Sequence, residues 1–167
     1  MIYGDLLKFE RIDEPDLAGL AARLAPMLST GGVVFLIGDL GAGKTTFARA
    51  LLVALGVETR IKSPTYSLIE SYAVGDLTIH HLDLYRIADA GELEWLGLAD
   101  LTAGSYLLLV EWPEHARTGL PQPDLILRLA HAPESRDVVL EASTPLAATW
   151  VERVRHLGRP AAGRVST

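Results

Sequence analysis

The hydrophobic pattern of the chain is clearest between residues 33 and 55. Val33 to Ile37 form a continuous apolar run, which is typical of a strand buried on both faces of a parallel sheet. The glycine-rich stretch GDLGAGKTT follows at 38–46. Residues 46–55 then carry apolar side chains at helical spacing, up to a stop at Gly56. The pattern predicts a strand, a glycine loop and a helix in direct succession.

The rest of the chain also reads as alternating helices and strands. An edge strand is expected within 3–9, followed by a helix that Asp13 caps and that Pro26 kinks or ends. The leucines of that helix form one stripe: Leu17, Leu20, Leu24 and Leu28. The further expected elements are a β-hairpin over 65–73 and 77–85, a short helix from Asp89 to Leu96, a strand over 106–110, an antiparallel pair over 124–130 and 137–142, and a helix after Thr144 with Leu146, Trp150, Val154 and Leu157 on one face. We expect one α/β domain over 1–157, with a mixed sheet flanked by helices, and a disordered tail from Gly158 to Thr167.

The glycine loop matches the phosphate-binding pattern G-x-x-x-x-G-K-[ST] at every position. Its glycines let the backbone curl with the N–H groups inward, and the helix that follows adds unpaired N–H groups at the same place. Lys44 would reach the β- and γ-phosphates, and the Thr45 hydroxyl would ligate Mg²⁺. The sequence therefore predicts a P-loop NTPase fold. The nucleotide would be bound by Gly38, Asp39, Leu40, Gly41, Ala42, Gly43, Lys44, Thr45 and Thr46, with the Asp39 side chain facing outward.

Composition narrows the possible partners. The formal net charge of −6 leaves no broad basic face for nucleic acid, so any role with RNA is expected to pass through a partner protein. The absence of cysteine excludes disulfides and zinc–thiolate sites. The start of the chain lacks the apolar core of a signal peptide, and no apolar run approaches membrane length. We expect a cytoplasmic protein with no membrane association.

Two acids are candidates for the metal and the attacking water that nucleotide hydrolysis requires. Glu111 ends the apolar strand 107–110, at the edge where open α/β sheets bind ligands. Asp83 ends a second strand-like run, although either acid also fits a plain strand-end or loop role. The stretch Ser63-Pro64-Thr65 lies where GTPases carry a mobile segment that orders around the γ-phosphate, and it fits a plain turn nearly as well.

Three other features have simpler interpretations. His80 and His81 are adjacent on a strand, so they point to opposite faces and cannot hold one metal; we interpret both as packing or surface residues. Trp112 fits either the core or an exposed interface. Arg86 is a candidate arginine finger, and without a supplied arginine the intrinsic hydrolysis should be slow.

Five blocks occur in a fixed order: GDLGAGKTTF (38–47), KSPTYSL (62–68), HLDLYR (81–86), ELEWLGL (92–98) and LVEWPE (109–114). Together they resemble the bacterial TsaE (YjeE) ATPases of tRNA threonylcarbamoyladenosine biosynthesis, over roughly residues 10–156. The resemblance implies an ATPase with ATP and Mg²⁺ as cofactors, required for threonylcarbamoyladenosine formation at position 37 of tRNAs reading codons that begin with A. The implied partners are a TsaD-like transferase and a TsaB-like protein, with tRNA reached only through their complex.

The resemblance also implies roles for individual residues. Thr45 and Glu111 would hold the metal, and Asp83 would take a Walker-B-like role. Ser63-Pro64-Thr65 resembles the first switch, and Trp112 falls in the second. The catalytic set would then be Lys44, Thr65, Asp83 and Glu111, with Glu14 and Arg136 close to the nucleotide. Ser135 replaces a family glycine, and it would be strained if the turn there requires a positive φ.

Two alternatives remain open at this stage. A small-molecule kinase shares the strand–loop–helix opening, but it needs an acceptor pocket and usually an arginine-rich lid, and residues 86–105 contain only Arg86 among basic residues. A nucleotide-gated, non-catalytic scaffold is the second. The preference for ATP over GTP rests on the resemblance, and the chain lacks the Asn-Lys-x-Asp motif of GTPases.

Overall fold

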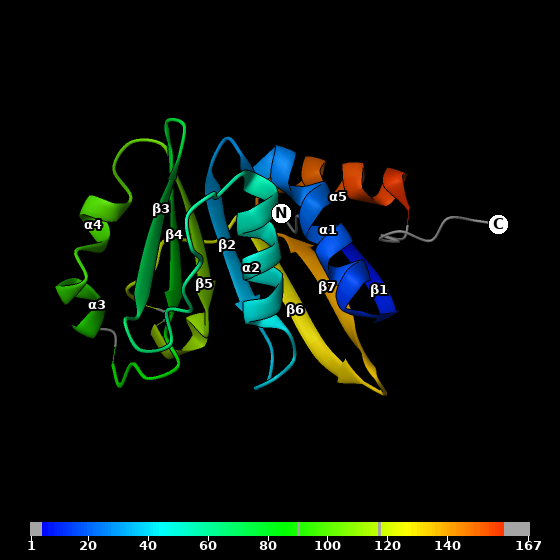
Figure 1. Ribbon diagram of the computed structural model, residues 1–167, viewed down its shortest axis with the longest axis horizontal. Helices are drawn as coiled ribbons and strands as arrows, with labels where there is room; N and C mark the ends of the chain where they lie inside the picture. The colour runs from blue at the N-terminus through cyan, green and yellow to red at the C-terminus, as the bar shows by residue number, and fades with distance from the viewer. Residues whose placement is uncertain (1–4, 90, 117, 159–167) are drawn as a thin grey trace.

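A mixed seven-stranded sheet runs through the centre of the protein (Figure 1). The computed structural model describes residues 5–89, 91–116 and 118–158. The strands are β1 (Leu6–Ile12), β2 (Gly32–Ile37), β3 (Ile69–Val74), β4 (Leu77–Asp83), β5 (Tyr106–Glu111), β6 (Leu125–Ala132) and β7 (Ser135–Ala142). Their order is β1-β7-β6-β2-β5-β4-β3. The central pairs β6–β2, β2–β5 and β5–β4 are parallel, and the outer pairs are antiparallel. The predicted α/β P-loop fold with a mixed sheet is confirmed.

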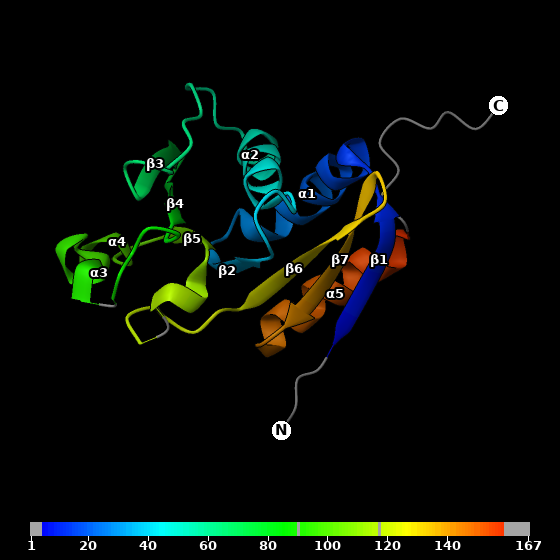
Figure 2. The same cartoon turned by 90° about the horizontal axis from the view of Figure 1, so that it is seen from below.

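Helices cover both faces of this sheet (Figure 2). The helical elements are α1 (Glu14–Leu28), α2 (Lys44–Leu55), α3 (Gly91–Trp95), α4 (Leu98–Leu101), the 3₁₀ turn η1 (Pro113–Ala116) and α5 (Pro145–Leu157). Helices α1 and α2 lie side by side on one face, and α5 packs against β7 and β1 as part of the same apolar cluster; the smaller cluster on the other face includes the buried side chain of α3. No helix in the described part of the chain is both long enough and apolar enough to cross a membrane.

The alternation of side chains along the central strands divides the core in two. Val34 and Leu36 of β2 belong to the larger apolar cluster, with residues of α1 and α2. Val33 belongs to a smaller cluster that also contains Leu108 and Leu93, the buried residue of α3. Because β2 and β5 are buried on both faces, their sequences read as continuous apolar runs.

Helix α1 begins as the sequence predicts and ends later. Asp13 is the N-cap, and its Oδ1 accepts the Asp16 N–H at 2.8 Å in a capping box. The four leucines of the predicted stripe are fully buried. The expectation that Pro26 ends the helix is wrong, because α1 continues to Leu28. A proline this close to the C-terminus removes only one N–H bond from the ladder, so the last turn survives.

Other boundaries differ from the predictions. Strand β1 extends to Ile12, and the hairpin strand β3 begins at Ile69 because 64–67 form a turn. The buried face of α5 is Ala147, Trp150, Val151 and Val154, whereas Leu146 and Leu157 are exposed. Helix α4 was not predicted; it begins after Gly97, whose positive φ of 65° redirects the chain at the end of α3. Ala90, in the predicted cap, and residues 159–167 of the predicted tail at 158–167 lie outside the described residues, whereas Gly158 is the C-cap of α5.

Candidate functional site

The phosphate loop connects the end of β2 to the start of α2. Gly41 and Gly43 adopt positive φ values of 76° and 110°, which side-chain-bearing residues rarely tolerate. The Ala42 N–H donates to the carbonyl of Asp39 at 3.1 Å, which closes the curl, and the Asp39 side chain is exposed as predicted. Gly43 is also the N-cap of α2, so the unpaired N–H groups of the first helical turn open onto the loop.

Lys44 is almost fully buried, at 5% exposure, although it carries an ammonium group. Its Nζ donates to the carbonyl oxygens of Gly38 and Asp39 and lies 4.2 Å from the ring centroid of Trp112. Burial lowers the pKa of Lys44, and the nearby acids, Glu111 first among them, oppose that shift. The loop carbonyls thus hold the Lys44 ammonium in place, and phosphate oxygens can replace these carbonyls as acceptors.

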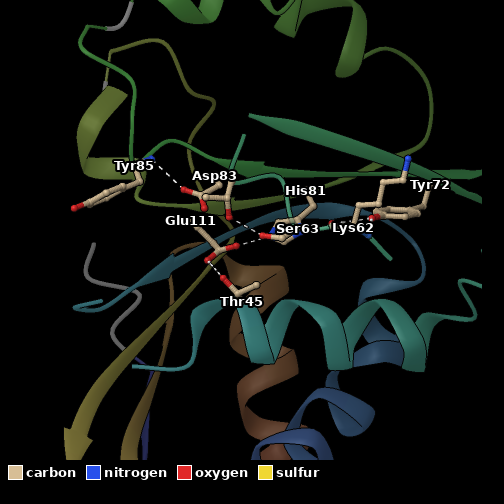
Figure 3. A network of polar contacts seen from close by, with 9 residues as sticks. Thr45, Lys62, Ser63, Tyr72, His81, Asp83, Tyr85 and Glu111 are labelled. Carbon is tan, nitrogen blue, oxygen red and sulfur yellow. Dashed lines mark hydrogen bonds and ion pairs between the residues drawn. The ribbon is translucent and has the colours of Figure 1, made fainter. Parts of the chain in front are cut away.

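Thr45, Glu111 and His81 form a continuous chain of polar contacts that starts at the first turn of α2 (Figure 3). The Thr45 hydroxyl donates to Glu111 Oε1 at 2.7 Å, and Glu111 Oε2 lies 2.6 Å from His81 Nε2. Glu111 is only 1% exposed. His81 is buried, in agreement with its interpretation as a packing residue, and it also contacts the predicted metal-binding acid. His80 bonds Ser71 instead.

Asp83 lies beside Glu111, because the two residues are register partners at the ends of β4 and β5. Its Oδ1 accepts the N–H of Tyr85 at 3.0 Å. Burial raises the pKa of Asp83, and the neighbouring charge of Glu111 raises it further. Of the two candidate acids, Glu111 is the one in contact with the Thr45 hydroxyl.

A cavity of about 340 Å³ brings most of the predicted residues together. It is lined by Leu40, Gly41, Gly43, Lys44, Thr45, Thr46, Thr65, Asp83, Tyr85, Arg86, Glu111, Trp112 and Arg136. Gly38, Asp39 and Ala42 shape the loop without lining this cavity. Glu14 is exposed and lies in an adjacent hollow with Thr45, Thr46 and Arg49, so the structure does not bring it into the main cavity.

The predicted switch segment is a turn at the mouth of this cavity. The hydroxyls of Ser63 and Thr65 lie 2.7 Å apart, and the Leu68 N–H donates to the carbonyl of Pro64 at 2.8 Å. Strand β3 starts only after this turn. The guanidinium of Arg86 lies 4.6 Å from the ring centroid of Tyr66, which is 83% exposed. Arg86 therefore lines the cavity while it is held against an exposed ring.

The hairpin between β6 and β7 brings Arg136 over the loop. A Cβ added at Gly43 would lie 2.5 Å from Arg136 Nη1, so the guanidinium covers that glycine closely. The condition for strain at Ser135 is not met, because the positive φ of 55° falls on Glu134, one residue earlier.

Sequence reasoning missed two further residues at the site. His131 Nε2 lies 3.0 Å from the carbonyl of Leu40, and Tyr85 lies on the cavity wall with its ring centroid 5.0 Å from that of Trp112. Strand alternation alone would have found His81, since it lies two residues before Asp83 and so shares its face. No local signal marks His131, because its place depends on the pairing of β6 with β2.

The donor set fits a magnesium ion bound together with a phosphate. The Thr45 hydroxyl and the Glu111 carboxylate are hard oxygen donors from two elements, which is the chemistry that Mg²⁺ prefers. Within the described ranges, no group of three His, Cys, Asp or Glu side chains is arranged to hold a metal. An ion held here would take its remaining ligands from phosphate oxygens and water, as Mg²⁺ commonly does.

The chain is similar to proteins of one family. Residues 12–138 match the family model described as "Threonylcarbamoyl adenosine biosynthesis protein TsaE". The tRNA threonylcarbamoyladenosine biosynthesis protein TsaE of Haemophilus influenzae is 41% identical over 114 residues, which are 68% of this chain and 72% of that protein. The Bacillus subtilis protein of the same name is 35% identical over 137 residues, 81% of this chain and 85% of its own length. The crystal structure of Bacillus subtilis YdiB superimposes with a TM-score of 0.74 at 30% identity, over 95% of this chain and 100% of that one.

Proposed function

This chain belongs to the TsaE family of threonylcarbamoyl adenosine biosynthesis proteins, and on that premise we propose that it binds ATP with Mg²⁺ and hydrolyses the ATP slowly. The family acts in the biosynthesis of threonylcarbamoyladenosine on tRNA, which implies association with the tRNA modification machinery. The site residues are proposed to act on the triphosphate, while the threonylcarbamoyl group is transferred by a partner.

One observation carries this proposal: the Thr45 hydroxyl lies 2.7 Å from Glu111, in the cavity that Lys44 and the glycine loop also line. The Lys44 ammonium exchanges the carbonyls of Gly38 and Asp39 for phosphate oxygens, so it moves little on binding. When bound, Mg²⁺ neutralises charge on the phosphate oxygens. Glu111 and Asp83 lie at adjacent strand ends, where their carboxylates would orient water.

The contacts of the arginines support slow hydrolysis. Arg86 lies against the Tyr66 ring and Arg136 covers Gly43, so both guanidinium groups are already engaged in contacts within the protein. An arginine correctly placed in the transition state is worth about 10³–10⁵ in rate. We propose that a complex of TsaD-like and TsaB-like proteins stimulates turnover. Contact with tRNA passes through that complex, because the chain carries a net charge of −6.

The experiment that tests this function measures phosphate release from ATP, with and without the TsaB–TsaD complex. We expect slow turnover alone, faster turnover with the complex, and loss of both in Lys44→Ala and Glu111→Ala. Equal rates for the isolated and the complexed protein would refute the partner-coupled mechanism.

The same samples distinguish the two alternatives. Phosphate transfer to a nucleoside, nucleotide or sugar in preference to water would identify a kinase. A nucleotide-gated scaffold would lose binding to the complex in Lys44→Ala, while wild-type hydrolysis stayed at background. The kinase result is not expected, because residues 91–95 and 98–101 form the short helices α3 and α4 in place of a lid, and the Leu93 side chain is buried in the smaller core cluster.

A further inference from the structure

We propose that His81 is a positioning residue: it holds the Glu111 carboxylate in the orientation in which Oε1 accepts from Thr45, and Glu111 and Thr45 are the two residues that would hold the metal. The inference rests on the proposed function, because the consequence of this orientation is metal binding. It assigns a role to a buried histidine that lies on the same face of β4 as Asp83.

The contact is short and shielded from water. His81 Nε2 lies 2.6 Å from Glu111 Oε2, and the two side chains are 2% and 1% exposed. The residues come from the neighbouring parallel strands β4 and β5, whose register fixes their separation. In a site shielded from water, a hydrogen bond to a carboxylate is strong, and an unpaired carboxylate oxygen lowers the stability of the fold.

The second ring nitrogen, Nδ1, indicates which nitrogen of His81 carries the proton. His81 Nδ1 is buried and has no hydrogen-bond partner among the described residues. A proton on Nδ1 alone would leave a buried donor unpaired and would turn the Nε2 lone pair toward the carboxylate. A proton on Nε2 avoids both penalties, so His81 donates and Glu111 accepts.

This donor determines how Glu111 faces the phosphate loop. With Oε2 bound to His81, the other oxygen accepts from Thr45 at 2.7 Å, and the carboxylate plane is fixed from both sides. The terminal torsion of a glutamate is otherwise broad. Without His81, the carboxylate can rotate away from the metal position. Loss of such an outer partner typically costs about 10- to 100-fold in metal affinity or activity.

The chain offers a matched control on the same strand. His80 is also buried, at 5% exposure, and its Nδ1 bonds the Ser71 hydroxyl at 2.7 Å. His80→Phe therefore removes a buried histidine and a hydrogen bond from β4 without touching Glu111. His81→Phe removes the donor to Glu111, and His81→Gln restores an N–H donor at a similar reach.

The first test concerns the ligand-free wild-type protein. Long-range ¹H–¹⁵N NMR spectra of its histidines should show His81 with the proton on Nε2. A proton on Nδ1 would overturn the proposal, whatever the protein does with nucleotide.

The second test titrates a fluorescent ATP analogue with and without Mg²⁺. In His81→Phe we expect a rise of about 10-fold or more in the Mg²⁺ concentration that gives half of the Mg²⁺ effect on affinity for the ATP analogue. The affinity for the analogue without Mg²⁺ should be unchanged. His81→Gln should regain most of the loss, and His80→Phe should match the wild type. A wild-type Mg²⁺ dependence in His81→Phe, or equal defects in His81→Phe and His80→Phe, would overturn the proposal. If the wild type binds no nucleotide, the proposed function fails instead, and the NMR result still decides the orientation of His81.

Discussion

Replacing Thr45 by valine tests the central contact of the site without any ligand. Valine has the same shape and the same β-branching as threonine, so the change removes only the hydroxyl. That hydroxyl donates to Glu111 Oε1 at 2.7 Å, and Glu111 is 1% exposed. The substitution therefore leaves one oxygen of a buried carboxylate without its donor.

The expected cost follows from the type of bond that is lost. A hydrogen bond to a charged group contributes about 1.5–3 kcal/mol to stability. Thr45 lines an open cavity, so water compensates in part, and we expect a loss near the lower part of that range, about 2 kcal/mol. For a chain of this size each kcal/mol lowers the melting temperature by about 2–4 °C, which gives about 4–8 °C for Thr45→Val.

Thermal unfolding followed by circular dichroism, without nucleotide or Mg²⁺, measures this loss. Thr45→Ser keeps the hydroxyl and should melt close to the wild type. A double-mutant cycle with Glu111→Ala isolates the pair, and we expect a coupling free energy of at least about 1 kcal/mol. If Thr45→Val and Thr45→Ser have the same melting temperature, or if the coupling free energy is near zero, the contact between Thr45 and Glu111 does not stabilise the ligand-free site.

Three further predictions concern other parts of the site. Asp83→Asn should raise the melting temperature at pH 7 and abolish turnover. Burial raises the pKa of the Asp83 carboxyl above 3.8, so the ionised carboxylate destabilises the folded state at pH values above the raised pKa. This destabilisation disappears as the pH falls toward 3.8. The increase in melting temperature from Asp83→Asn should therefore be smaller in melting curves at pH 5 than at pH 7. Glu134→Gly should stabilise the protein by about 0.5–1 kcal/mol in urea unfolding, because it relieves the positive φ of 55° in the turn between β6 and β7. Gly43→Ala should weaken nucleotide affinity about tenfold or more in a titration, because its Cβ would meet Arg136 Nη1 at 2.5 Å at a φ of 110°.

Local sequence was sufficient for the elements that depend on local physics. The caps at Asp13 and Thr144, the glycine stop at Gly56 and the phosphate loop are all present in the structure. Each follows from interactions within a few residues, so no knowledge of the rest of the chain was needed. The boundaries that were wrong, such as the start of β3, depend on where a neighbouring strand stops pairing.

The glycine loop, the two strand-end acids and the fold class were determined by the sequence itself, because residue type and spacing suffice to specify a glycine curl and the acids that end strands. Only the tertiary structure decided that Glu111 contacts Thr45, that His81 supports Glu111, that Trp112 lies against Lys44, and that Glu14 stays outside the main cavity. These contacts join residues brought together by the order and register of the parallel strands. Register is set by the packing of the whole sheet against its helices, and no short stretch of sequence contains that information.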